Sequence, residues 1–314
     1  MAPAWTRRLA PASERGQKRG KVSRARAELA LVANAAIWGA TFVLVKEALG
    51  GISPALFLAA RFSVATAALA VLFRGIWKGP VPWKSLLGGG VTGFFLYSGF
   101  LLQTLGLRLT TPPKSAFITG LSTVMVPLLA ALVYHIRPQV SEVAGVLVAT
   151  AGMALMTLEG PFGSSIGRGD WLTFSCAIAF AAHIVTLGHY SGRMSFELLS
   201  VTQVGFAALA ALLLLPWVEM SQVQWRPAVI WAIIITGLLA TALAFTVQAW
   251  AQHYTTSTRT ALIYSLEPVF AWIMSYCITG ESLSRRAAAG AALILSGVVL
   301  VEMKPFDSRL HPLK

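Results

Sequence analysis

The sequence contains little charge. Only 12% of its 314 residues are Asp, Glu, Lys or Arg, whereas 56% are hydrophobic. Soluble domains carry about 25% charged residues, so this chain has too few to cover the surface of an ordinary soluble protein. Of the charged residues, the acidic ones are the fewer, with 12 against 25 basic ones. The composition therefore excludes a typical soluble protein and favours one that lies largely within a membrane.

Cysteine and the common enzyme motifs are also scarce or missing. The two cysteines, Cys176 and Cys277, fall in apolar segments without metal-ligand spacing, so we expect both to be buried packing residues. The sequence has no phosphate-binding loop, no His-Glu-x-x-His zinc motif and no Gly-x-Ser-x-Gly nucleophile motif. We therefore expect no metal, no cofactor and no enzymatic activity.

Long apolar segments dominate the remaining sequence. A helix needs about 20 apolar residues to cross the hydrocarbon core of a bilayer. Only helices and closed barrels satisfy their backbone hydrogen bonds there, and these segments are too long for barrel strands. The sequence therefore predicts an all-α integral membrane protein with ten transmembrane helices. They are expected at Glu28–Leu49, Ser53–Phe73, Trp83–Leu107, Thr111–Tyr134, Val140–Leu158, Asp170–Tyr190, Phe196–Pro216, Pro227–Ala251, Thr256–Thr279 and Arg285–Val301.

Positive charge is concentrated before the first helix. Eight basic residues lie within the first 27 residues. Such a cluster holds a tail in the cytoplasm and attracts anionic lipids rather than indicating a nucleic-acid partner. We expect a multi-pass protein of the inner (plasma) membrane with both termini cytoplasmic. An Arg-rich tail with few acidic residues also fits an organelle transit peptide, which is the alternative interpretation.

The two halves of the sequence repeat each other at a spacing of 145 residues. Residues 110–127 align without a gap with residues 255–272, and glycines at 145 and 152 align with those at 290 and 297. Because polar and glycine matches rarely arise by chance in an apolar chain, we infer a duplication. The predicted organisation is a tail (1–27), a five-helix repeat (28–158), a connection (159–169), a second five-helix repeat (170–302) and a tail (303–314).

An odd number of helices per repeat has a consequence for topology. The second repeat must enter the membrane from the side opposite to the first, which makes the repeats inverted. Inverted repeats are typical of secondary transporters, in which the substrate site lies near mid-membrane at the repeat interface and access alternates between the two sides. The duplication therefore favours a transporter over a receptor or a scaffold.

Four segments carry a family signature. They are Asn34–Phe42, the pair Arg61-Phe62, residues 102–121, and residues 261–269 with Gly280-Glu281. These segments resemble the EamA-type transporters of the drug/metabolite transporter superfamily, over about residues 28–302. The resemblance implies export of amino acids, metabolites or drugs without ATP hydrolysis. The first repeat departs from the family pattern at Pro112-Pro113 and at His135-Ile136.

Two charged residues fall inside predicted helices, where a charge usually faces a cavity or a partner. Glu267 precedes Pro268 deep in the ninth helix, and Pro127 lies in the fourth. Prolines interrupt helices, and interrupted helices point to a substrate site. Glu267 either couples transport by binding protons or cationic groups or only fixes helix packing. For Arg61 we favour snorkelling to the outer interface over an ion pair with Glu267.

The candidate substrate-binding residues are polar and aromatic side chains within the helices. They are Asn34, Trp38, Tyr97, Gln103, Thr119, His183, Gln248 and Tyr264. Trp38 is equivalent to His183, and Gln103 to Gln248, and we expect each pair to face across the repeat interface. Such a set suits a small amphipathic solute, although each residue alone also fits a helix-packing hydrogen bond.

The sequence thus predicts a secondary transporter, and on the family resemblance an exporter, of a small organic solute within the lipid bilayer. Proton coupling and exchange both remain open as the driving force. The alternatives are a membrane-embedded lipid-modifying enzyme, which the missing catalytic motifs disfavour, and a non-transporting membrane subunit. No soluble domain is present to support a sensory or assembly role.

Overall fold

The computed structural model describes residues 24–109, 112–134, 138–157, 167–217, 223–279 and 284–302. Within these residues the chain is all helical and has no strand. Each of the ten predicted segments is helical. Most of the predicted tails and of the 159–169 connection, and the departure at His135-Ile136, lie outside the described residues.

Six of the helical segments are long and apolar enough to cross a membrane. They are Pro54–Leu72, Trp83–Leu107, Phe117–Tyr134, Arg168–Ser191, Phe196–Trp217 and Pro227–Ala251. Their outer surfaces are apolar, with side chains such as Leu72 and Leu132 each 70% exposed. Large exposed apolar surfaces are unusual in soluble proteins. The chain is therefore a multi-pass membrane protein.

The helices of the first half are α2 (Arg24–Ala48), α3 (Pro54–Leu72), α4 (Trp83–Leu107), α5 (Pro112–Gly120), α6 (Ser122–Tyr134) and α7 (Val140–Thr157), with a 3-10 turn η2 (Arg74–Lys78) after α3. The second half forms α8 (Arg168–Ser191), α9 (Phe196–Leu214), η3 (Leu215–Trp217), α10 (Pro227–Gly237), η4 (Leu238–Leu243), α11 (Ala244–Ala251), α12 (Ser257–Tyr264), α13 (Glu267–Thr279) and α14 (Arg285–Glu302). The segment η4 is a π-helix that joins α10 to α11 without a break.

The two halves match helix by helix, and most of the equivalent helices are separated by the 145-residue spacing. Adding 145 to the bounds of α4 gives 228–252, and α10, η4 and α11 together span Pro227–Ala251. The interruptions match as well: Leu121 separates α5 from α6, and Ser265 and Leu266 separate α12 from α13. The fourth and ninth predicted helices are therefore both broken in two, at equivalent positions.

Serine caps set the register of α3 and α9. Ser53 Oγ accepts a hydrogen bond from the backbone N–H of Leu56, and Ser195 Oγ accepts one from Leu198. A serine before the first turn satisfies an N–H that has no partner within the helix. The caps are 142 residues apart, so Arg61 and Gln203, each eight residues beyond its serine, occupy equivalent positions.

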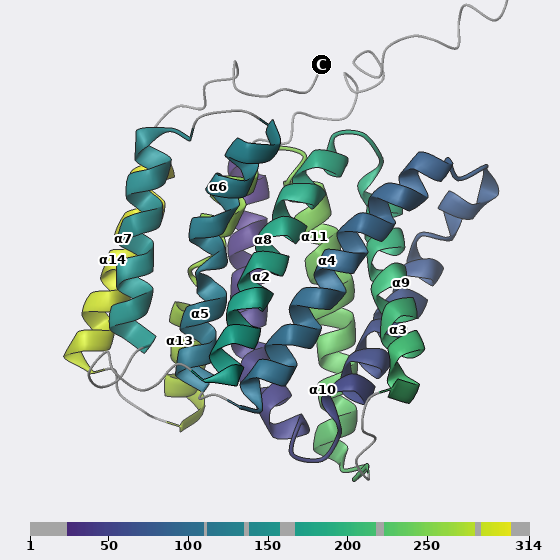
Figure 1. Cartoon of the computed structure of the whole chain (residues 1–314), viewed down its shortest axis with the longest axis horizontal. Helices are drawn as coiled ribbons and strands as arrows, with labels where there is room; N and C mark the ends of the chain where they lie inside the picture. The colour runs from purple at the N-terminus through teal and green to yellow at the C-terminus, as the bar shows by residue number, and fades with distance from the viewer. Residues whose placement is uncertain are drawn as a thin grey trace, which may run out of the picture.

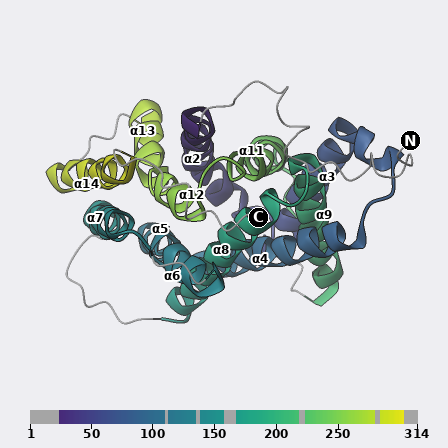
Figure 2. The same ribbon diagram turned by 90° about the horizontal axis from the view of Figure 1, so that it is seen from above.

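The two halves exchange their first two helices. Helix α2 packs against α10, α11, α12 and α13, whereas the equivalent α8 packs mainly against α4, α5 and α6. Similarly, α3 packs on α10 and η4, and α9 on α4. We call α2, α3 and α10–α13 the first bundle, and α8, α9 and α4–α6 the second bundle. Figures 1 and 2 show the resulting two rows of helices, with α7 and α14 at one edge and α3 and α9 at the other.

Glycines bring α7 and α14 into close contact. A Cβ atom placed on Gly145 would lie 2.8 Å from the carbonyl oxygen of Gly297, and one on Gly152 would lie 2.6 Å from that of Gly290. Small residues of this kind let membrane helices approach closely. Gly145 is equivalent to Gly290, and Gly152 to Gly297, so each of the two contacts is the repeat equivalent of the other. The edge formed by α7 and α14 is therefore symmetric.

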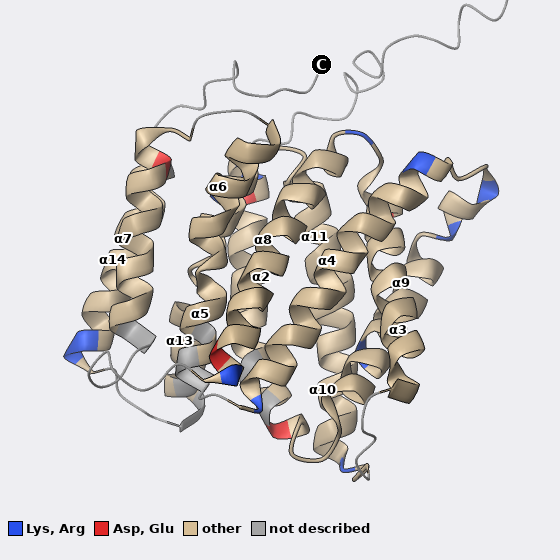
Figure 3. Ribbon diagram, in the orientation of Figure 1, with Lys and Arg blue, Asp and Glu red and all other residues tan. Residues whose placement is uncertain are grey.

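The helix ends define two faces of the molecule. At the proximal face, α2 begins close to the start of α12 and the end of α14, because Arg259 contacts both Glu28 and the carbonyl oxygen of Val301. At the distal face, the end of α4 meets the start of α8, where Gly106 lies against Gly169. Figure 3 shows the charged residues gathered mainly at these two ends, with a middle band that is nearly uncharged.

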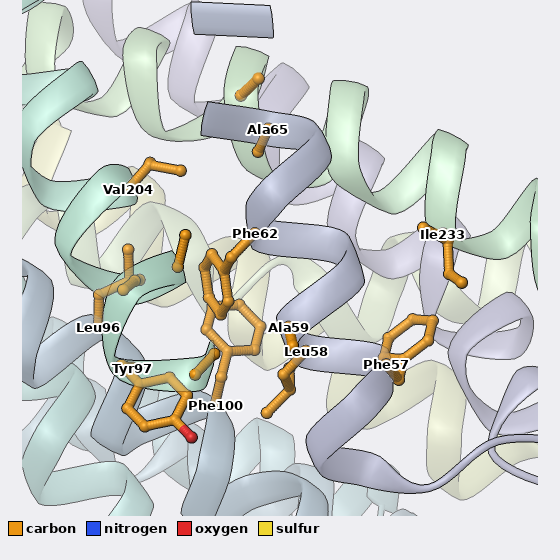
Figure 4. Close-up of a cluster of buried hydrophobic side chains, with 14 of the residues drawn as sticks. Phe57, Leu58, Ala59, Phe62, Ala65, Leu96, Tyr97, Phe100, Val204 and Ile233 are labelled. Carbon is orange, nitrogen blue, oxygen red and sulfur yellow. The ribbon is translucent and has the colours of Figure 1, made fainter. Parts of the chain in front are cut away.

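Aromatic and aliphatic side chains from both bundles fill the largest core cluster. Phe57, Leu58 and Phe62 of α3 are fully buried there, together with residues of α4, α9 and α10; Figure 4 shows this cluster. Cys176 is buried in α8, as we expected. Cys277 is exposed on α13, so the expectation that it is a buried packing residue is wrong. Its position on an outward helix face in an apolar sequence is compatible with contact to lipid.

Candidate substrate site

Equivalent residues of the two repeats meet around a pair of phenylalanines. Phe100 of α4 and Phe245 of α11 are related by the 145-residue spacing, and their rings lie 6.1 Å apart at 85°. The ring of Phe245 also lies 5.5 Å from both Trp38 and His183. The structure therefore brings the predicted pair Trp38 and His183 to the same ring, at the interface of the two bundles.

His183 and Gln203 form a buried polar pair in the second bundle. His183 Nε2 and Gln203 Oε1 are 3.0 Å apart, and both residues are almost fully enclosed. Among the described residues, the side-chain amide nitrogen of Gln203 has no hydrogen-bond partner, and it is fully enclosed. Buried polar groups are usually hydrogen-bonded, so this N–H is an exception.

Arg61 occupies the equivalent position in the first bundle. Its Nε donates to Thr241 Oγ1 at 2.6 Å, its Nη2 donates to the carbonyl oxygen of Ala240 at 3.2 Å, and its guanidinium lies 4.5 Å from the centre of the Phe100 ring. Only 4% of the residue is exposed. The expectation that Arg61 snorkels to the outer interface is therefore wrong, because the π-helix offers its charge nearer partners.

The π-helix η4 and the residues that flank it in α10 and α11 supply backbone acceptors to the site. Thr241 Oγ1 donates to the carbonyl oxygen of Thr236, five residues earlier, at 2.8 Å. Trp38 Nε1 donates to the carbonyl oxygen of Ala240 at 2.9 Å, and Asn34 Nδ2 to that of Ala244 at 2.7 Å. Single π-helical turns occur frequently at functional sites. The equivalent part of α4 is regular α-helix, so the second repeat alone has this feature within the described residues.

Tyr264 and Glu267 flank the interruption between α12 and α13. Tyr264 Oη accepts a hydrogen bond from Asn34 Nδ2 at 3.4 Å, and its ring lies edge-on to Trp38 at 4.7 Å. Glu267 is the first residue of α13, and its backbone lies against Gly39 of α2. Its carboxylate forms no hydrogen bond to the described residues.

Arg61 and Glu267 do not form an ion pair in the described structure. Trp38 lies between them, since its indole shares the Ala240 carbonyl with Arg61 while its ring packs on Tyr264, one turn before Glu267. The two intramembrane charges are therefore separate, and each is without an oppositely charged partner among the described residues.

The remaining predicted residues have different surroundings. Thr119 Oγ1 lies 3.9 Å from the Cys176 sulfur, which places it between α5 and α8. Tyr97 is buried beside Phe62, as Figure 4 shows. Pro268 is the second residue of α13, directly after the interruption, whereas Pro127 lies inside α6, six residues after the interruption at Leu121. Only one of the two predicted prolines thus stands at a break.

Gln103 and Gln248 are not brought together. Gln248 Nε2 donates to Gln252 Oε1, and Gln252 Nε2 donates to the carbonyl oxygen of Ile184 in α8. Gln103 lies along α8 between the levels of Phe180 and Thr173, which contact Gly99 and Gly106. Each glutamine lies three residues beyond its phenylalanine, Phe100 or Phe245, on helices that run in opposite directions, so at 1.5 Å per residue the two are roughly 9 Å apart along the helices. They therefore do not face one another in this structure.

Hydrogen bonds close the proximal face between the bundles. Gln252 Nε2 and Ser257 Oγ both donate to the carbonyl oxygen of Ile184, at 2.9 and 3.2 Å. Thr123 Oγ1 of α6 donates to the carbonyl oxygen of Ala261 in α12 at 3.2 Å, and α12 packs along α6. No comparable packing joins the equivalent α5 and α13 within the described part of the chain. The two faces are therefore closed to different degrees.

A metal centre finds no support in these residues, because the described ranges contain no group of three or more His, Cys, Asp or Glu that could hold an ion. The site instead combines aromatic rings, a buried arginine, an unpaired carboxylate and backbone carbonyls. Sequence reasoning missed Phe100, Phe245, Gln203 and Thr241. Of these, the phenylalanines could have been found, because they too are separated by 145 residues.

Comparison with known proteins finds the same duplication of the chain. The model of the EamA-like transporter family matches the chain twice, over residues 25–158 and 167–303. The chain belongs to the EamA-like transporter family. An uncharacterized transporter of Archaeoglobus fulgidus is 35% identical over 287 residues, which cover 90% of this chain and 88% of that protein.

Two further proteins extend the comparison of this EamA protein. A probable terminal-alkyne amino-acid exporter of Streptantibioticus cattleyicolor is 25% identical over 291 residues, covering 89% of this chain and 94% of that protein. A solved crystal structure superposes with a TM-score of 0.72 at 21% identity, covering 89% of this chain and 97% of that chain. The latter likeness concerns the fold alone.

Proposed function

We propose that this EamA protein is a secondary exporter of a small amphipathic organic solute, by alternating access across the inner membrane. The observation that carries the proposal is the cluster of Trp38, Phe100, His183 and Phe245 at the interface of the two bundles. Substrate sites in inverted-repeat transporters lie at such an interface near mid-membrane. The site residues in our proposal are this cluster with Asn34, Tyr97, Thr119, Tyr264 and the two charges, Arg61 and Glu267.

The proposed topology has ten spans, formed by residues 28–158 and 170–302, with both termini in the cytoplasm. The basic residues before α2 support this orientation, because the positive-inside rule retains them in the cytoplasm. The proximal face is then cytoplasmic and the distal face is external. Since the proximal face carries the hydrogen bonds between bundles, the structure corresponds in this proposal to an outward-facing state.

Alternating access then requires a defined set of bonds to break. Rocking one bundle against the other to open the cytoplasmic face separates Gln252 and Ser257 from the Ile184 carbonyl and Thr123 from that of Ala261. These three are bonds between neutral groups, worth about 1 kcal/mol each. A fourth contact that must separate is that of His253 Nδ1 with the carbonyl oxygen of Ser191 in α8, 3.0 Å apart. Their combined strength is small enough for the binding of a solute or proton to overcome.

The solute class in this proposal is that of amino acids and related metabolites. The name of the Streptantibioticus relative, an amino-acid exporter, supports this class. The site itself offers aromatic faces for an apolar side chain and two opposite charges for polar groups. A solute that carries both kinds of group fits better than a purely apolar drug.

Uptake into proteoliposomes tests the proposal. The purified full chain is reconstituted and radiolabelled leucine, phenylalanine and threonine are followed, with and without a pH gradient. We expect at least one to enter faster than into protein-free liposomes, and Trp38→Ala to remove that uptake. Leu147→Ala, on the exposed face of α7, is the matched control and should transport normally. Absence of uptake for these solutes and for a wider panel of metabolites and cationic drugs would contradict a transport function.

A further inference from the structure

Arg61 is a buried cation without an anionic partner among the described residues. Its hydrogen bonds go to a hydroxyl and a backbone carbonyl, both neutral, and the third contact is the face of Phe100. Arg259, which is also buried, differs in this respect, because its Nη1 lies 3.6 Å from the carboxylate of Glu28. An uncompensated charge at membrane depth is costly and is usually found where a ligand or ion passes.

One N–H group of the guanidinium is also unused. Arg61 Nη1 donates to no atom of the described residues. The hydroxyl of Tyr97, on the same helix as Phe100, likewise makes no hydrogen bond to the described residues.

We infer that Arg61 is the residue that binds the carboxylate of the transported solute, and that carboxylate-bearing solutes are the substrate class. A carboxylate matches the planar guanidinium and makes charge-assisted hydrogen bonds about twice as strong as neutral ones. It would bind Nη1 directly and compete with the long 3.2 Å bond from Nη2 to Ala240. This inference rests on the proposed transport function and specifies which group of the solute the site recognises.

The surroundings of Arg61 favour an organic acid over an inorganic anion. Phe62 and Phe100 lie edge to face beside it, and Phe100 continues to Phe180 and Phe245. Aromatic rings bind apolar groups and offer chloride or phosphate no hydrogen bonds. A solute with a carboxylate at one end and an apolar body at the other can contact Arg61 and these rings together.

The second repeat explains why one end of the solute is recognised in this way. Gln203, the equivalent of Arg61, is neutral and already bonded to His183. Within the cluster, positive charge is therefore confined to the side of the first bundle. A carboxylate binds on that side, and the remainder of the solute lies toward Phe245 and His183.

A series of leucine analogues tests this assignment with purified protein in proteoliposomes. Uptake of radiolabelled leucine, phenylalanine and threonine is compared with that of their carboxamides, and 4-methylpentanoate and 3-methylbutylamine serve as competitors. We expect the free acids to enter, 4-methylpentanoate to compete, and the amides and the amine to be at least tenfold weaker. Equal uptake of acids and amides overturns the inference but leaves the transport function intact. Failure of every solute, charged or neutral, overturns both.

Variants separate recognition from folding. Arg61→Gln should lose the preference for acid over amide, and Arg61→Lys should keep part of it, because a lysine retains the charge without the planar donors. Arg259→Lys is the matched control, and whatever its rate, its acid-to-amide ratio should equal that of the wild type. Folding is checked by size-exclusion chromatography. If Arg61→Gln does not fold, the Arg61→Lys ratio decides, and a ratio unchanged from the wild type contradicts the assignment.

Discussion

The corner between α11 and α12 and the corner between α4 and α5 occupy equivalent positions in the two repeats, yet they are bonded differently. At the first corner, Gln252 and Ser257 donate to the carbonyl oxygen of Ile184 in the opposite bundle. Their counterparts at the second corner are Leu107 and Pro112, whose side chains have no donor. The repeat determines where the helices run, and a few polar side chains that only one repeat possesses give the proximal face its hydrogen bonds between the bundles.

The centre of the molecule likewise contains both residues that are the same in the two repeats and residues that differ between them. The aromatic pair Phe100 and Phe245 is the same in both repeats, whereas Arg61 corresponds to Gln203 and Trp38 to His183. The symmetric residues form an apolar surface between the bundles. The asymmetric residues give the two sides different charge and hydrogen-bonding capacity. In the proposed function, the orientation of the solute therefore depends on the residues that break the repeat.

Among the residues that differ between the repeats, Glu267 should have the largest effect on uptake when it is replaced. Its counterpart in the first repeat is Ser122, so the duplication supplies no second carboxylate. We expect Glu267→Gln to reduce uptake to the level of protein-free liposomes, because the amide keeps the size of the side chain but cannot bind a proton or pair with a cation. Radiolabelled leucine uptake, measured with and without an inward pH gradient, checks this.

Ser122→Ala is the matched control for Glu267→Gln, since it changes the equivalent residue in the first repeat. Near-normal uptake is expected, together with the pH-gradient response of the wild type. If Glu267→Gln transported at a normal rate and kept that response, Glu267 would be a packing residue and another group would have to carry the coupling.

The sequence alone predicted the helices well because their cause is local. Each apolar segment must satisfy its backbone hydrogen bonds within itself, so the positions of all ten helices followed from hydropathy. The symmetric contact of Gly145 with Gly297 also follows from the repeat, once helices five and ten are paired. Trp38 and His183 meet for the same reason, since both lie near the middle of equivalent helices.

What the sequence did not predict depends on contacts between distant helices. The exchange of α3 and α9 between the halves leaves no local mark, so the sequence predicted Arg61 at the outer membrane interface instead of against Thr241. The π-helix contains neither proline nor glycine, and its only flanking signal is Gly237 immediately before it. Gln103 and Gln248 were paired by alignment, although residues near the ends of inverted helices lie toward opposite faces.

A second test uses the symmetric edge formed by α7 and α14, where equivalent substitutions in the two repeats should destabilise the protein equally. Gly152 and Gly297 are equivalent, and a Cβ on either would lie 2.6 Å from a carbonyl oxygen of the partner helix. We expect Gly152→Ala and Gly297→Ala to destabilise the protein by similar amounts, about 1–3 kcal/mol as for other overpacked contacts. Thermal denaturation in detergent measures this. Gly90→Ala in α4 is the control, because its Cβ would meet Phe206 at an ordinary 3.6 Å.

Unequal effects at the two glycines would sharpen the comparison by showing that the α7–α14 edge also differs between repeats. A stabilised Gly152→Ala variant would contradict the close approach itself. In either case the result concerns packing, since neither glycine belongs to the proposed substrate site.

The smallest expected effect concerns the proximal face. Gln252→Leu with Ser257→Ala removes two neutral hydrogen bonds to Ile184, together worth about 1–3 kcal/mol. If these bonds hold the bundles closed, their loss should raise the fraction of molecules open at this face by about tenfold. The readout is labelling by an aqueous thiol reagent of a cysteine at position 261, a residue only 1% exposed beneath α6, in a background without Cys176 and Cys277.

Two comparisons make that measurement specific to the contact between bundles. Thr246→Val removes a hydrogen bond that stays within one helical segment, from Thr246 Oγ1 to the carbonyl oxygen of Ala242, and should leave labelling at position 261 unchanged. Leu107→Gln introduces a donor at the equivalent distal corner and should favour the opposite state, so labelling should rise although no proximal bond is lost. Both results follow if the faces compete for closure through side chains that only one repeat possesses. Unchanged labelling in both the Gln252→Leu/Ser257→Ala and the Leu107→Gln proteins would mean that helix packing alone, and not these hydrogen bonds, selects the closed face.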